Sequence, residues 1–69
     1  MVEIFKTNVT DERHAALILR LLKEQWPRYE VNFDLEDCDR ILRIENDSID
    51  HLQIVAMMHM QGYACEVLN

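Results

Sequence analysis

The chain has 69 residues, 49% of them hydrophobic and 29% charged, which fits one compact domain with a small core. At this length folding buries only about 60% of the surface that the unfolded chain exposes, so single core residues matter. Thirteen acidic against seven basic residues give a net charge of −6. This balance disfavours nucleic acid as a partner, because phosphate backbones are bound by clustered Lys and Arg.

No stretch approaches the roughly 18 consecutive apolar residues that a membrane-spanning helix requires. No basic and apolar leader resembles a signal peptide either, so we expect a cytoplasmic protein without a membrane partner. The two cysteines, Cys38 and Cys65, are too few and too far apart for a disulfide framework or a Cys-x-x-Cys motif. A small buried hydrophobe is the commoner role for each.

The first predicted element is a strand over residues 2–9, rich in β-branched and aromatic side chains. Alternation places Phe5 and Val9 on its main face and Ile4 on the opposite one. A helix follows, with Thr10 as its N-cap and two acidic residues in its first turn, where they suit the helix dipole. Its apolar positions follow a helical spacing, and Pro27 ends it. These positions are Ala15, Leu17, Ile18, Leu19, Leu21 and Leu22.

Residues 29–35 alternate apolar and polar side chains, which is typical of a half-buried strand. The polar stretch 36–39 is short enough for a hairpin connection. Residues 40–45 then form the partner strand, with Leu42 and Ile44 as the inward pair.

A second helix begins near Asp47 or Ser48, either of which can cap it. Gly62, the only glycine, is placed to end this helix in a left-handed conformation. Residues 63–68 predict a short last strand. The spacing predicts one apolar helix face made of Ile49, Leu52, Val55, Ala56, His59 and Met60.

The order β-α-β-β-α-β predicts a single α+β domain over residues 1–69, with the ferredoxin-like split βαβ arrangement. The sheet would be antiparallel in the order 4-1-3-2, with two helices on one face. This topology brings the exit of the first strand (10–14), the hairpin tip (36–39) and the exit of the second helix (59–65) to one end. His51 lies at the other end.

The chain resembles the heavy-metal-associated domain family, which includes copper chaperones and the amino-terminal modules of metal-pumping ATPases. The resemblance covers the whole chain and rests on residues 5–9, 32–36, 40–45 and 62–68, of which Gly-Tyr-Ala followed by Glu-Val is the most specific. Tyr63 takes the position of the family's loop tyrosine, and we expect it to be a core-edge aromatic side chain that shields the first loop.

The family binds Cu(I), Zn(II) or similar ions through a Cys-x-x-Cys at the strand–helix junction, and the matching residues here are Asp11 and His14. A carboxylate and an imidazole suit Zn(II) or Cu(II) better than Cu(I). Two such ligands make a weak site, because zinc usually takes four, or three and water. Cys38, His59 and Cys65 are candidate further ligands, although strand alternation and helix phase could equally turn them into the core.

The resemblance and the lost thiols together favour a non-catalytic binding or interaction module for which no cofactor is expected. The alternative is a metal-binding or metal-transfer protein with a non-thiol Asp/His site that takes Zn(II) or Cu(II) weakly. An enzyme is not expected, since the chain has no nucleophile elbow, no glycine-rich phosphate loop and no triad spacing. Ile4 and Ile41 point towards the open sheet face, which suggests a protein partner or a homodimer through that face or an edge strand.

Overall fold

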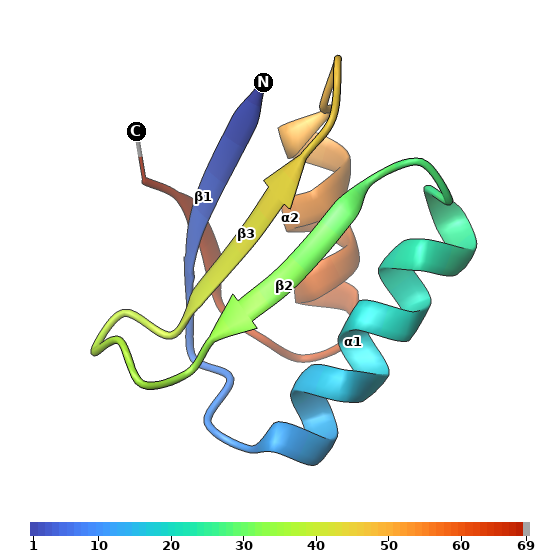
Figure 1. The fold of residues 1–69 in the computed structure, drawn as a ribbon. Coiled ribbons are helices and arrows are strands. Elements are labelled where there is room, and N and C mark those ends of the chain that lie inside the picture. Colours follow the sequence, from blue (N-terminus) through green and yellow to red (C-terminus); the bar gives the residue numbers. More distant parts are fainter. Residues whose placement is uncertain (69) are drawn as a thin grey trace.

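The computed structural model describes residues 1–68, and these form one four-stranded antiparallel sheet and two helices. The elements in chain order are β1 (Val2–Thr7), α1 (Glu12–Gln25), β2 (Glu30–Asp34), β3 (Ile41–Glu45), α2 (His51–Met60) and β4 (Cys65–Val67) (Figure 1). The strand order β2-β3-β1-β4 is the predicted order 4-1-3-2 read in the other direction, so the ferredoxin-like α+β fold is confirmed.

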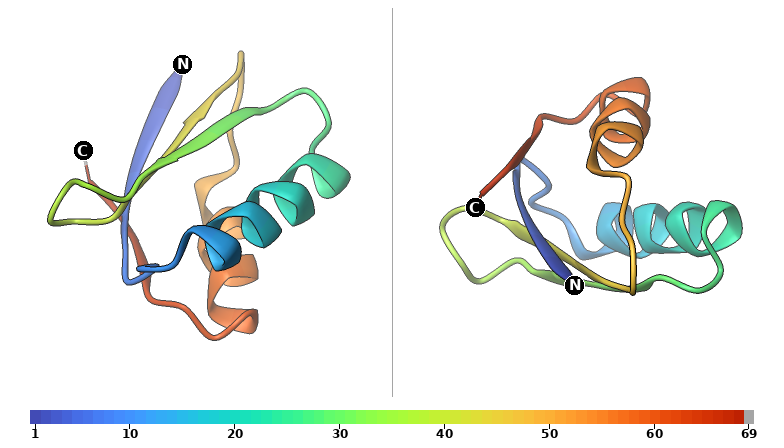
Figure 2. Two further views of the ribbon diagram at one scale, coloured as in Figure 1. Left: turned by 60° about the horizontal axis from the view of Figure 1, so that its bottom comes forward. Right: turned by 90° about the horizontal axis from the view of Figure 1, so that it is seen from above.

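Both helices cover the same face of the twisted sheet, as Figure 2 shows. The core lies between them and the sheet, and its largest fully buried side chains come from both layers: Phe5, Val9, Ile18, Leu22, Leu42, Ile44, Ile54 and Met58. The predicted inward pair, Leu42 and Ile44, is fully buried. The opposite face of the sheet is open, and Ile4 and Ile41 are half-buried on it.

The helix starts differ from the prediction. Asp11, rather than Thr10, caps α1: its Oδ1 accepts the backbone N–H of Arg13 at 2.6 Å and that of His14 at 3.3 Å. The start of α2 is capped by Asp50, rather than Asp47 or Ser48, through a 3.3 Å bond from the Gln53 N–H. Several neighbouring residues in each segment have side chains able to cap, so residue type alone does not decide which of them does.

The predicted apolar face of α2 is wrong. The helix buries Ile54 and Met58, whereas Leu52 and Met60 are 71% and 84% exposed. The helix is apolar on all sides, so the spacing of its apolar residues does not fix which side meets the sheet. Its end is as predicted, because Gly62 has a left-handed φ of 91° and Tyr63 donates its N–H to the Met58 carbonyl at 3.0 Å, the bond of a Schellman motif.

No helix among residues 1–68 is both long enough and apolar enough to span a membrane.

The Thr7 side chain bonds two backbone groups at the loop end of the sheet. Its hydroxyl donates to the Arg40 carbonyl at 2.6 Å and accepts the Val9 N–H at 3.2 Å, and the side chain is buried. Thr7→Val keeps the shape but leaves both backbone groups without this partner, so the free energy of unfolding should fall by about 2–3 kcal/mol. Urea denaturation measures the change. Thr7→Ser, which keeps the hydroxyl, is the control and should lose clearly less; equal losses would show that the bonds contribute little.

Candidate functional site

Three loops meet at one end of the domain, as the topology predicts (Figure 1). The Thr7 N–H donates to the Asp39 carbonyl at 3.0 Å, which joins the end of β1 to the hairpin tip. The Ala64 N–H donates to Asn8 Oδ1 at 2.9 Å, which joins the loop after α2 to the loop after β1. This end is therefore where a site shared by the three loops would lie.

Asp11 and His14, the residues that the resemblance suggests as metal ligands, have local structural surroundings. The Asp11 carboxylate caps α1 by accepting two backbone N–H groups. The His14 ring lies 6.2 Å from the ring of Tyr63, centroid to centroid, and the His14 side chain is exposed. Tyr63 is half-buried against the core, as predicted for a core-edge aromatic residue.

The other three candidate ligands lie in different surroundings. Cys38 is exposed at the hairpin tip, and Cys65 is buried at the start of β4. His59 is exposed on the last turn of α2 and, with Cys65, lines a hollow of about 400 Å³. Within residues 1–68 no three of these five candidates place their ligand atoms within 4.8 Å of one another.

Burial changes the chemistry of Cys65. Desolvation raises the pKa of its thiol from 9.0 to about 11. The thiolate is the form that binds soft metals and attacks electrophiles. At neutral pH Cys65 is therefore a protonated core residue, which agrees with the expectation of a small buried hydrophobe. Cys38 is exposed instead, so that expectation is wrong for it.

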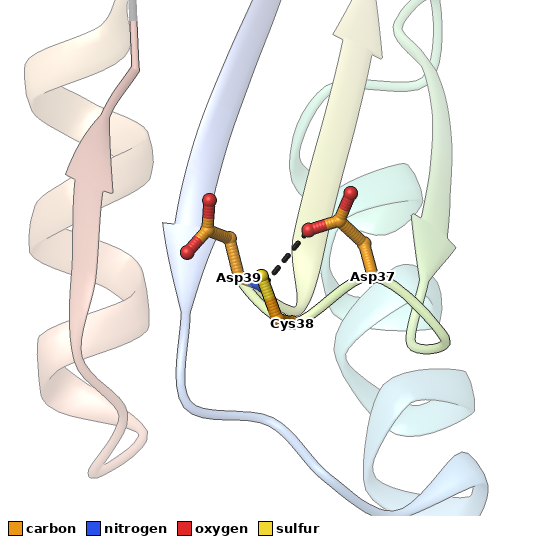
Figure 3. A group of neighbouring side chains, drawn as sticks. All are labelled: Asp37, Cys38 and Asp39. Carbon is orange, nitrogen blue, oxygen red and sulfur yellow. Dashed lines mark hydrogen bonds between the residues drawn. The ribbon is translucent and has the colours of Figure 1, made fainter.

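A cluster that the sequence did not single out lies at the hairpin tip. One ligand atom from each of Asp37, Cys38 and Asp39 lies within 4.8 Å of the others (Figure 3). Asp37 Oδ1 accepts the Asp39 N–H at 2.8 Å, and the Asp39 carboxylate faces Lys6 Nζ at 3.8 Å. The turn brings the consecutive side chains together, and strand alternation gives no signal for such a turn. Both carboxylates already have partners within the protein, as exposed acidic groups often do.

A second feature that the sequence did not predict is that the outward side of α2 is apolar. The helix contains no Asp, Glu, Lys or Arg, and seven of its ten residues are apolar. Two hollows of about 310 and 260 Å³ lie between it and α1. Their lining includes Leu21 and Trp26 from the α1 side and Met57 from α2. We call the five residues Leu21, Leu52, Ala56, Met57 and Met60 the helical apolar surface.

Comparison of the chain with protein-family models, with curated proteins and with solved structures finds no match.

The donor set at the β1–α1 junction does not fit the Cu(I) centre that the resemblance implies. Such a centre needs soft thiolates, and this junction offers a capping carboxylate and an exposed imidazole. The one thiol buried near the loop end is held in its protonated form. A metal role for this domain would therefore have to use harder ligands and a harder ion.

We expect zinc to bind the wild-type protein and His14→Ala with the same affinity, in the millimolar range, because two ligands make a weak site. Isothermal titration calorimetry measures the affinity. Cys38→Ser is the matched variant at the hairpin tip. Loss of binding in His14→Ala would establish the Asp/His site, and loss only in Cys38→Ser would assign the ion to the tip.

The raised pKa of Cys65 predicts how stability depends on pH. Between pH 9 and about 11 the unfolded thiol ionises while the folded one keeps its proton. The free energy of unfolding should therefore fall as pH rises through this window, by about 2 kcal/mol. Cys65→Ala lacks this component, although it is less stable at every pH. Urea denaturation across the window checks the difference in slope; parallel curves for the two proteins would contradict the prediction.

Proposed function

We propose that this domain is a non-catalytic binding or interaction module that resembles a heavy-metal-associated domain without its thiol site. The observation that carries the proposal is the helical apolar surface, centred on the outward side of α2. The functional surface would therefore be the helical layer rather than the loop end at which the family holds its metal.

The exposure of α2 is unusual for a helix of its composition. A helix that is apolar on all sides is normally buried on all sides. Here only one side packs on the sheet, and Leu52 and Met60 remain 71% and 84% exposed. Covering a side chain of this kind contributes about 1.5–3 kcal/mol. A partner that covers both would gain a large part of an ordinary binding free energy from these two residues.

The hollows beside α2 extend this surface towards α1. Met57 lines both of them, and Leu21 and Trp26 line one each. Methionine side chains are flexible and polarizable, so they adapt to the shape of a partner. The amides of Gln25 and Gln61 line both hollows as well. A shallow groove between two helices with this mixed lining is suited to an amphipathic helical segment.

The alternative function, metal binding or transfer through Asp11 and His14, would use Asp11 Oδ2, because Oδ1 accepts both capping N–H groups. Asp11 and His14 together give an ion only two protein ligands, and zinc usually takes four, or three and water. The small number of ligands favours the interaction module, and the zinc titration described above tests the alternative.

The proposed function is tested by capture of partners from a lysate of the source cells. Immobilised wild-type domain should retain at least one protein that the Met60→Glu variant does not, because the new carboxylate would be buried without a partner in the complex. Mass spectrometry of the eluates gives the readout. Asn32→Glu, which adds the same charge on the exposed side of β2, is the control and should retain the partner.

The proposal fails if the Met60→Glu variant and the wild-type domain retain the same proteins in the same amounts. Met60 is 84% exposed, so its replacement should leave the fold intact.

A further inference from the structure

We propose that the partner of the helical apolar surface is a second copy of this chain, which packs α2 against α2 about a two-fold axis. The inference rests on the proposed interaction function and names its partner. It is carried by the distribution of charge, the spacing of side chains along α2 and the size of the surface.

The distribution of acidic residues favours α2 over the other helix and the strands as the contact surface between two copies. The protein carries a net charge of −6, so two copies repel each other. Every other helix and strand has at least one acidic residue, and α2 has none. Two carboxylates beside it have partners within the protein: Asp50 caps the helix, and Glu24 of α1 lies 3.5 Å from Arg20. A second copy therefore meets the fewest uncompensated negative charges at α2.

The side chains of α2 are arranged so that the helix can pack against itself. Leu52, Ala56 and Met60 follow one another at intervals of four residues and form one stripe along the exposed side. Ridges of this spacing interdigitate in the commonest class of helix packing. A two-fold axis beside Ala56 lets the helices approach closely at the small residue and brings Leu52 of each copy level with Met60 of the other.

The size of the surface indicates a dissociable dimer. A standard interface buries about 800 Å² per partner, and the accessible surface of the domain is 4608 Å². The ten residues of α2 span only about 15 Å, so the groove lining on α1, including Leu21 and Trp26, must take part as well. An interface that combines a short helix with part of a neighbour lies at the small end of the range, and we expect a dimer that dissociates on dilution.

The open sheet face, which the sequence suggested for a homodimer, is less suited to a second copy. Val2, Ile4 and Ile41 lie on this face among charged neighbours; the two isoleucines are half-buried and Val2 is 40% exposed. Arg43 pairs with Ile4 across β1 and β3, and Asp34 pairs with Ile41 across β2 and β3. A two-fold contact here would cover four carboxylates with only two cations, Lys6 and Arg43, on the same face. The carboxylates are Glu30, Asp34, Glu45 and Glu66.

Sedimentation equilibrium of the purified chain over a range of concentrations tests the inference. The wild-type protein should reach the dimer mass, and Ala56→Glu should weaken dimerisation at least about 100-fold, since it places two unpaired carboxylates beside the axis. Leu52→Glu is a second variant, at a position 71% exposed, where folding should not be affected. The control, Asn32→Glu, adds the same charge on the open sheet face and should leave the dissociation constant unchanged. Circular dichroism verifies that each variant is folded.

Three results would overturn the inference: a wild-type monomer at millimolar concentration, a dimer that survives both Ala56→Glu and Leu52→Glu, or a dimer lost in Asn32→Glu. The last would move the contact to the sheet. If the wild-type chain is monomeric but retains from a lysate a protein that Met60→Glu does not, only the second copy is wrong and the proposed function stands. A monomer with no such retained protein contradicts both.

Discussion

The Thr7 hydroxyl donates to the Arg40 carbonyl and accepts the Val9 N–H, so one buried group joins the end of β1 to the end of the β2–β3 hairpin. Arg40 has a left-handed φ of 48°, a conformation that costs a non-glycine residue about 1–2 kcal/mol. It is held there by its N–H bond to the Asp37 carbonyl and by its guanidinium on the Leu35 carbonyl. This set of bonds fixes the position of the hairpin tip relative to the end of β1.

At the neighbouring junction, the Asp11 side chain stabilises the start of α1. It accepts two of the first amides of the helix through one oxygen, and its negative charge is stabilised at the positive end of the helix dipole. A carboxylate is also a hard ligand, so this junction offers a soft ion no favourable donor. The chemistry of the residue present is thus explained by folding without any metal.

Prediction of the fold from the sequence was most reliable for features that one physical signal determines. The alternation along β2 and β3 placed Leu42 and Ile44 inward because a strand has only two faces, one of them buried. Gly62 marked the end of α2 because few other residues take a positive φ easily. The caps were misplaced because Thr10 and Asp11, or Asp47, Ser48 and Asp50, can all supply a capping oxygen. The tip cluster of Asp37, Cys38 and Asp39 depends on a turn conformation that residue spacing does not encode.

The misassigned face of α2 and the proposed interaction surface have the same origin. Charged residues on one side of a helix normally mark the side that faces water. In α2 that signal is absent, and the sheet selects Ile54 and Met58 through tertiary packing. The remaining side keeps Leu52 and Met60, which the monomer does not need for its core. An acidic protein could have placed carboxylates at these positions without cost to its fold. The absence of acidic residues from α2 lowers the charge repulsion that a partner meets there, which is the physical reason to look for the function at this helix.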